Sequence, residues 1–454
     1  MSESRSSTVK DMTEGSITKQ IVLFSLPLMF GNIFQMLYNT VDSIVVGNYV
    51  STQALAAVGS TTMIINMLVF FFNGFSVGAG VIISRFFGAK ELSRLHKAIE
   101  TTMAATFILC IALTVIGVLG VKPMLRFMAT PDDVFADATT YLTIYFLGFS
   151  GLLVYNMGSG ILRAVGDTIR PLYFLILTSV MNIILDLVFV KGIHMGIEGV
   201  AYATIISQFV SAFLILCLLL RSEDIYRLTL KDLKIDPDIM KLIFMVGLPT
   251  GIQSVITAFS NIFVQSYINF FGSSCMAGWS SYNKLDSFIM LPLQSIAMAA
   301  TTFVSQTIGA GKVKRADKGT RISIAIGVTI TGLIGLLLFI FARPAIRMFS
   351  AEDAVMEYGS LFIHTNVFFL MFNCVNHTLA GALRGRGDSK GPMIIMISTF
   401  VVLRQIYLFT VTHYVANTPQ LVGFGYPVGW MSCCLVEVTY YIIKYKKGKG
   451  FGNV

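Results

Sequence analysis

Six ionisable side chains interrupt long apolar stretches of this 454-residue sequence. A charge in such a stretch is destabilising unless it is paired or binds a ligand, so each of the six is a candidate functional residue. Carboxylates in apolar surroundings hold cations or protons, and basic groups there neutralise acids or contact a ligand. The six residues are Asp42, Asp186, Lys284, Asp286, Arg404 and Glu437.

Two of these acids lie on polar faces of predicted helices. Asn182 and Asp186 are four residues apart and therefore share a face, and Asp42 ends a second face whose members are three or four residues apart. Two carboxylates with an amide oxygen can hold Na⁺, or they can share a proton when buried. The alternative is that each acid only makes a hydrogen bond to a neighbouring helix. The second face comprises Asn32, Gln35, Asn39 and Asp42, with Tyr38 one turn before Asp42.

The second half of the chain has a polar helix face without an acid. Its members recur every four residues, and they either line a wet cavity or make hydrogen bonds between helices. Lys284 and Asp286 are two residues apart and point in different directions, so each is assigned to an ion pair elsewhere or to substrate binding. Arg404 and Glu437 are expected to pair with each other, and Lys284 is expected to neutralise Glu437 or the neighbours of Asp286. The polar face comprises Gln253, Thr257, Asn261 and Gln265.

The composition identifies the elements that carry these residues. With 55% hydrophobic and 13% charged residues, the chain is more apolar than a soluble protein, in which roughly a quarter of the residues are charged. An apolar run of about 18 residues or more predicts a transmembrane helix. An all-α protein with twelve such helices is predicted, at 21–46, 53–83, 99–121, 136–161, 170–190, 197–220, 240–270, 276–305, 321–341, 356–381, 392–413 and 421–443.

The basic residues outside these runs are unevenly distributed. The termini and the loops after the even-numbered spans, together with the first two residues of the spans that follow them, carry 26 Lys and Arg residues, whereas the loops on the other side carry 5. Because basic loops stay in the cytoplasm, both termini are predicted to be cytoplasmic. The same distribution accounts for the net charge of +9 without a nucleic-acid partner.

The two halves of the chain are copies of one unit. A shift of 221 residues superposes the segment 160–171 on 381–392, and a shift of 222 superposes Pro27 on Pro249. Six spans return the chain to its starting side, so we expect two lobes related by a pseudo-twofold axis along the membrane normal. The predicted parts are a cytoplasmic segment 1–20, an N-lobe 21–220, a linker 221–239, a C-lobe 240–443 and a basic tail 444–454.

The acids on the first and fifth spans are not duplicated. The shift of 222 equates Asp42 with Val264, and the shift of 221 equates Asp186 with Tyr407. A purely structural role would be expected in both copies, so the sequence predicts a cation site in the first half only.

The repeated GxLRxxGDxxxP segment is interpreted as a tight glycine turn in which Arg and Asp stabilise the loop and Pro opens the next helix. The Lys and Ser/Thr of a phosphate-binding loop are absent, and nothing else in the sequence resembles an ATP site. No cofactor is expected, and an ion gradient should drive transport. Clustered His, Cys or Ser/Asp groups, which an enzyme would need, are also missing from the sequence.

The opening of the chain resembles that of the multidrug and toxic compound extrusion (MATE) transporters. The similarity lies in the segment 27–35, in Asp42 and Gly47, and in the Leu-Ala-Ala at 55–57, together with the doubled loop motif and the six-plus-six plan. The resemblance implies a V-shaped pair of lobes that exports organic cations by antiport with H⁺ or Na⁺.

Within that family the chain is more similar to the DinF-like branch than to the NorM-like branch. The DinF-like pattern implies a cation site of Asp42, Asn182 and Asp186, completed by Tyr141 on span 4 and Thr204 on span 6. The NorM-like branch adds acids on spans 7 and 10. Here the polar residues of span 10 are instead Asn366, Asn373 and His377.

We therefore predict a multidrug exporter of the bacterial or archaeal cytoplasmic membrane, acting as a monomer on small organic cations. The alternative is a flippase for a lipid-linked or polysaccharide precursor, whose cavity should be more cationic. The coupling ion, H⁺ or Na⁺, stays open, and Na⁺ would be held by Asp42, Asn182 and Asp186. The residues predicted to line the substrate cavity are Gln35, Tyr38, Asn39, Gln253, Thr257, Asn261, Lys284 and Asp286.

Overall fold

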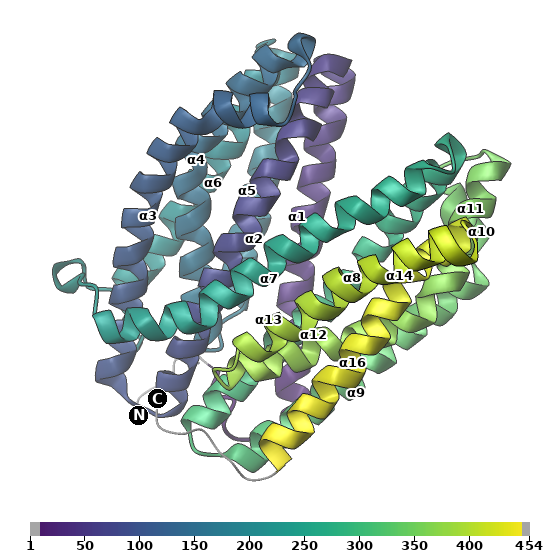
Figure 1. Cartoon of the computed structure of the whole chain (residues 1–454). Coiled ribbons are helices and arrows are strands. Elements are labelled where there is room, and N and C mark those ends of the chain that lie inside the picture. Colours follow the sequence, from purple (N-terminus) through teal and green to yellow (C-terminus); the bar gives the residue numbers. More distant parts are fainter. Residues whose placement is uncertain (1–9, 447–454) are drawn as a thin grey trace. The chain divides into compact units, whose positions relative to one another are not determined.

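A computed structural model describes residues 10–446 (Figure 1). The ends of the predicted N-terminal segment and basic tail, 1–9 and 447–454, lie outside the described residues. Within 10–446 all regular structure is helical. The longer helices are α1 Ile17–Tyr49, α2 Thr52–Gly88, α3 Leu92–Phe127, α4 Asp132–Ala164, α5 Ile169–Asp186, α6 Ile197–Arg221, α7 Pro237–Asn269, α8 Ser273–Gly309, α9 Val313–Ile340, α11 Asp353–Asn366, α12 Leu370–Gly385 and α16 Gly425–Lys446.

Several spans are not continuous α-helices but include π-helical or 3₁₀ segments. Shorter α-helical pieces are α10 Ala342–Arg347, α13 Lys390–Met396, α14 Arg404–Thr410 and α15 Pro419–Gly423. The π-helical segments are η1 Leu187–Gly192, η4 Ile397–Leu403 and η5 Val411–Val415, and the 3₁₀ segments are η2 Leu230–Asp232 and η3 Val367–Phe369.

The twelve predicted spans are confirmed. Between residues 10 and 446 there are twelve helical stretches long and apolar enough to cross a membrane, and each predicted span lies within one of them to within a residue. Helices are the expected solution because hydrocarbon offers backbone N–H and C=O groups no partner outside the helix. Many helices are longer than the predicted spans, since polar residues at their ends continue the same turns. The apolar runs in the sequence therefore marked only the central part of each helix, and the helix continues beyond it at its polar ends.

Small residues let the helices of the first half approach closely, as is usual between helices in lipid. Helix α4 packs against α2, α3 and α6, and Figure 1 shows α3, α4 and α6 side by side. Three glycines of α4 face α6. A Cβ atom on Gly151 would lie 2.9 Å from the backbone of Gln208 and Phe209, and one on Gly148 would lie 2.2 Å from Ile205.

The duplication seen in the sequence recurs in the packing. Helix α8 begins and ends 221 residues after α2, and α11 and α12 together cover the range of α4 shifted by 221. Contacts repeat in the same register, since Gly160 approaches Ser76 while Gly381 approaches Ala297. The two copies therefore share their internal helix packing as well as their sequence pattern.

The repeated loop motif has the predicted structural role. Gly166 and Gly387 both have left-handed φ angles, of +92° and +86°, which a residue with a side chain adopts only with strain. The Asp167 carboxylate accepts backbone hydrogen bonds from Ile169 and Arg170, both at 3.2 Å, at the start of α5. The interpretation as a helix-initiating turn is thus confirmed for this copy.

The chain forms two compact units that are not continuous in sequence. Among the described residues, unit 1 comprises 10–11 and 27–247, and unit 2 comprises 12–26 and 248–446. The first turns of α1 belong to unit 2 because the Arg315 side chain donates to the carbonyl oxygens of Met12, Glu14 and Gly15 at 2.9–3.1 Å. The predicted lobe boundaries, which follow the sequence repeat, remain a prediction.

The α4–α6 contact supplies a test of the packing. Replacing Gly151 with Ala should lower the free energy of unfolding by about 1–3 kcal/mol, because backbone atoms next to the new methyl cannot move aside as a side chain would. The same change at Gly59, where nothing lies within 4 Å, should be neutral or stabilise by about 0.5–1 kcal/mol. Thermal unfolding of the detergent-solubilised variants measures both. Equal melting temperatures would contradict the close α4–α6 packing.

Candidate functional site

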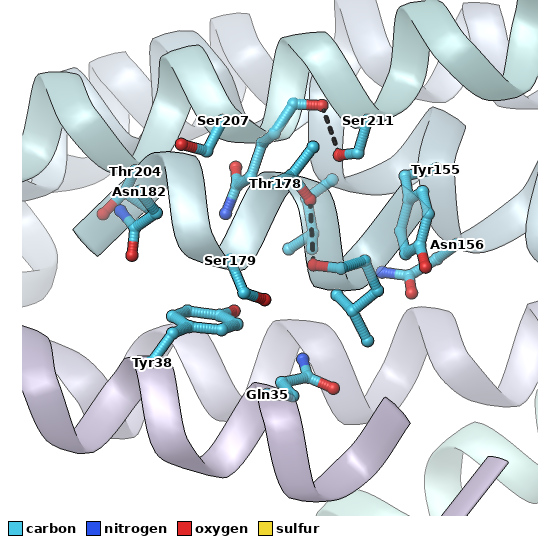
Figure 2. A pocket seen from close by; sticks show the side chains of 13 residues that line it. Gln35, Tyr38, Tyr155, Asn156, Thr178, Ser179, Asn182, Thr204, Ser207 and Ser211 are labelled. Carbon is cyan, nitrogen blue, oxygen red and sulfur yellow. Dashed lines mark hydrogen bonds between the residues drawn. The ribbon is translucent and has the colours of Figure 1, made fainter. Parts of the chain in front are cut away.

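A polar cavity lies inside unit 1, enclosed by α1, α4, α5 and α6 (Figure 2). It contains about 500 Å³ of space not filled by protein atoms, part of it open to the outside. Gln35 and Tyr38 reach into it from α1, opposite the polar residues of α5 and α6. The lining residues are Gln35, Tyr38, Leu152, Tyr155, Asn156, Leu175, Thr178, Ser179, Asn182, Thr204, Ser207, Gln208 and Ser211.

Helical spacing explains how these side chains meet. Asn182 follows Thr178 by one turn on α5, and a run of hydroxyls and an amide on α6 recurs at intervals of three and four residues. Only Thr204 of that run was predicted. The spacing of the run was itself a signal for a polar face, and it was overlooked because no member is charged. The α6 run comprises Thr204, Ser207, Gln208 and Ser211.

Asp42 and Asp186 are brought together next to this cavity. Their carboxyl groups are close enough to interact electrostatically, and Asp186 is completely buried. Yet both oxygens of Asp186 and the Oδ1 atom of Asp42 are buried without a hydrogen-bond donor among the described residues. Two carboxylates cannot stabilise each other without a positive charge or a proton between them. The pair therefore needs a proton or a cation.

The other three residues predicted for the cation site lie around this pair. Asn182 is 2% exposed, and both atoms of its amide lack a hydrogen-bond partner among the described residues. Tyr141 on α4 is close enough to interact electrostatically with both carboxyl groups. Thr204 lines the cavity beside Asn182, although its hydroxyl donates to the Val200 carbonyl at 2.9 Å. The structure thus places all five residues in one region of unit 1.

This arrangement suits a small cation or a proton. A proton between the two carboxyl groups would supply the missing hydrogen bond, and a Na⁺ ion would find carboxylate, amide and hydroxyl oxygens. Groups of three or more His, Cys, Asp or Glu side chains, which a transition metal would favour, are not found within 10–446. Oxygen ligands of this kind suit a hard cation or H⁺.

The cavity residues predicted in the second half lie in unit 2, and their role in substrate binding stays a prediction. Gln253 is buried and donates to the Met396 sulfur at 2.8 Å, and Asn261 accepts from Arg404 at 3.0 Å. The hydroxyl of Thr257 and one oxygen of Asp286 are buried without a partner in the described part of the chain. Of the predicted α1 residues, Gln35 and Tyr38 line the unit 1 cavity, whereas Asn39 is exposed.

The predicted pairing of Arg404 with Glu437 is wrong. Arg404 donates to Ser260 and Asn261 on α7, while Glu437 on α16 is fully buried beside Cys433 and interacts electrostatically with Arg384. Neutralisation of Glu437 by Lys284 is also wrong, because the Lys284 ammonium lies over the Phe349 ring at 5.4 Å on an exposed surface. Residue spacing along the chain could not show which helices face each other, and tertiary packing decides the partners.

Comparisons with known proteins agree with one another. The MatE family model matches the chain twice, at residues 27–188 and 249–410. The chain is 28% identical to the probable multidrug resistance protein YoeA of Bacillus subtilis, over 95% of both chains. It is 26% identical to the probable multidrug resistance protein NorM of Thermotoga maritima, over 95% of this chain and 93% of that one. A solved outward-facing multidrug resistance MATE family transporter superposes with a TM-score of 0.91 at 24% identity, over 98% and 99% of the two chains.

The incomplete acid pair can be tested without a transport assay. Replacing Asp186 with Asn should raise the melting temperature in alkaline, Na⁺-free buffer, because the amide can donate to Asp42 and one negative charge is removed. A gain of 1 kcal/mol corresponds to roughly 2–4 °C in a domain of about 200 residues. In acidic buffer the gain should shrink, since protons then complete the wild-type pair. The exposed Asp133 replaced with Asn is the matched control. A lower melting temperature of the Asp186 variant in both buffers would refute the interpretation.

Proposed function

We propose that this chain, which belongs to the MatE family, exports drug-like organic cations across a membrane in exchange for H⁺ or Na⁺. It is a multi-pass membrane transporter for small molecules and not an enzyme, as its family and its twelve spans indicate. The coupling ion, the cation site and the cycle described below go beyond what the family establishes.

The observation that carries the proposal is the uncompensated pair of carboxyl groups beside the cavity of unit 1. A buried pair of this kind is stable only when a proton or a cation joins it. An ion from outside that enters the site would remove the repulsion between α1, which carries Asp42, and α5, which carries Asp186. The free energy of the ion gradient is thereby converted into a change in how α1 packs.

Helix α1 is suited to such a change. Pro27 lies inside it and has no N–H for the hydrogen bond to the preceding turn, which makes bending easier there. Gln35 and Tyr38, which line the cavity, precede Asp42 on the same helix. Movement of α1 on ion binding would therefore alter the cavity and release its cargo outward, after which rocking of the lobes restores inward access.

The cavity favours neutral or cationic cargo over an anionic lipid precursor. Its lining consists of amide, hydroxyl, tyrosine and leucine side chains, with neither Lys nor Arg among the described lining residues. A pyrophosphate-linked lipid would need basic groups there. Tyrosine faces attract organic cations, and the neighbouring carboxyl groups add negative potential. This favours drug export over the flippase alternative.

The remaining features of the proposal follow from the sequence. The distribution of Lys and Arg supports cytoplasmic termini in a bacterial or archaeal plasma membrane. Helix α7 carries Gln253, Thr257 and Asn261 but no acid near its middle, which supports the DinF-like rather than the NorM-like branch. Unit 1 contains the complete set of five site residues, so a monomer suffices for the cycle.

Replacing Asp42 with Asn tests the coupling role directly. In a pump-deficient bacterium, resistance to ethidium or norfloxacin should fall to that of the empty vector, because the amide can neither take up a proton nor neutralise a cation. The exposed Asp133 replaced with Asn should retain wild-type resistance. Unchanged resistance of the Asp42 variant at equal membrane expression would refute the mechanism.

Purified protein in proteoliposomes distinguishes the two ions. A pH gradient and a Na⁺ gradient are imposed separately, and ethidium movement is followed by fluorescence. We expect one of the two gradients to drive transport and the Asp186→Asn variant to respond to neither. Equal transport with and without both gradients would contradict ion coupling altogether.

A further inference from the structure

The two copies differ in register at the point where the ion site lies. The MatE model matches start at Pro27 and Pro249 and end at Val188 and Thr410, a shift of 222 at both ends. The shift at the start of α5 and α13 is 221. The π-helical segment η4, whose turns hold more residues than α-helical turns, takes up the additional residue before Arg404. The equivalent of Asn182 is therefore Arg404, and that of Asp186 is Leu408.

Burial supports this register. Asn182 and Asp186 are 2% and 0% exposed, and Arg404 and Leu408 are 3% and 0% exposed. Tyr407, the equivalent at a shift of 221, is only partly buried. A shift of 222 instead of 221 thus aligns the buried face of α5 with the buried face of α14. The sequence repeat alone had aligned them one residue apart.

The rest of the site has counterparts in the same register. Asp42 corresponds to the buried Val264, so neither acid is retained in unit 2. Tyr38 corresponds to Ser260, and Thr204 corresponds to Tyr426. These are the positions that Arg404 contacts: it donates to the Ser260 hydroxyl at 2.7 Å, and its guanidinium carbon lies 4.7 Å from the centre of the Tyr426 ring.

The guanidinium is held through one terminal nitrogen and one ring face, while its Nε atom is buried without an acceptor among the described residues. One terminal nitrogen donates to Ser260 and also to the Asn261 amide oxygen at 3.0 Å, both on α7, while the Tyr426 ring of α16 covers it. Within residues 10–446 no carboxylate comes within ion-pairing distance of Arg404. Hydroxyl and amide oxygens with an aromatic face are a suitable environment for an isolated guanidinium.

We infer that Arg404 is a tethered cation that occupies, in unit 2, the place that a mobile ion takes in unit 1. It joins α7 to α14 and α16 permanently, with no dependence on pH or salt. The comparison with unit 1 rests on the proposed function, whereas the guanidinium site itself does not. The consequence is a transporter in which only one copy responds to the ion, with the other held in its ion-bound packing.

Chemical rescue tests the guanidinium site. Replacing Arg404 with Ala should lower the melting temperature of the full-length protein in detergent, because Ser260 and Asn261 lose their donor. Guanidinium chloride at millimolar concentration should restore at least half of the loss, since the free ion fits the vacated site. Urea at the same concentration should restore none of it.

A matched control distinguishes rescue by guanidinium bound at the Arg404 site from rescue by guanidinium filling any cavity. Phe400→Ala removes a large side chain that is 5% exposed in the same helical span, but it leaves Arg404 in place. Guanidinium should not raise its melting temperature. Equal rescue of both variants, or of neither, would overturn the inference.

A second pair of variants applies if the alanine variant does not fold. Arg404→Lys keeps the positive charge, and Arg404→Met keeps most of the volume without it. The lysine variant should have the higher melting temperature and retain more ethidium transport. A methionine variant as stable and active as the lysine variant would overturn the tethered-cation role. Because rescue is measured on purified protein without transport, its failure is distinguishable from a failure of ion coupling at Asp42.

Discussion

Hydrocarbon supplies no hydrogen bonds, so every polar group placed within a membrane needs a partner from the protein or from a bound solute. The backbone meets this constraint by forming helices. The side chains meet it differently in the two copies of the repeat, and that difference organises the function we propose. In unit 1 a pair of acids and an asparagine have buried atoms without partners among the described residues. In unit 2 an arginine takes the corresponding place, and it donates to Ser260 and Asn261 although its Nε atom has no acceptor within residues 10–446.

The site in unit 1, which needs a bound ion or proton, and the site in unit 2, which contains the Arg404 side chain, affect helix packing differently. The packing of α1 against α5 depends on whether an ion or a proton is present between Asp42 and Asp186, so it can follow a gradient. The packing of α7 against α14 depends on a side chain that cannot leave. Duplication supplies two similar helix bundles. Because a few buried residues differ, helix packing depends on a bound ion in one bundle and does not in the other.

The polar cavity in unit 1 links the pair of acids, Asp42 and Asp186, to substrate binding. Gln35 and Tyr38 belong to the helix that carries Asp42, and Asn182 lies in the cavity wall one turn before Asp186 on α5. Ion and substrate would thus act on the same two helices, which is the differential interaction that coupled transport needs. No long-range communication within unit 1 is required.

The sequence by itself determined the twelve spans, the duplication and the residues of the acid pair, because apolar runs, repeats and helical spacing are local properties. It also showed that neither acid recurs in the second half. It did not determine that Arg404 belongs to Ser260 and Asn261 rather than to Glu437, since helix order does not reveal which faces meet. The hydroxyls of α6 were overlooked because they carry no charge. Only the tertiary structure decided that one π-helical segment moves the register by a residue and places Arg404 where Asn182 lies in the other copy.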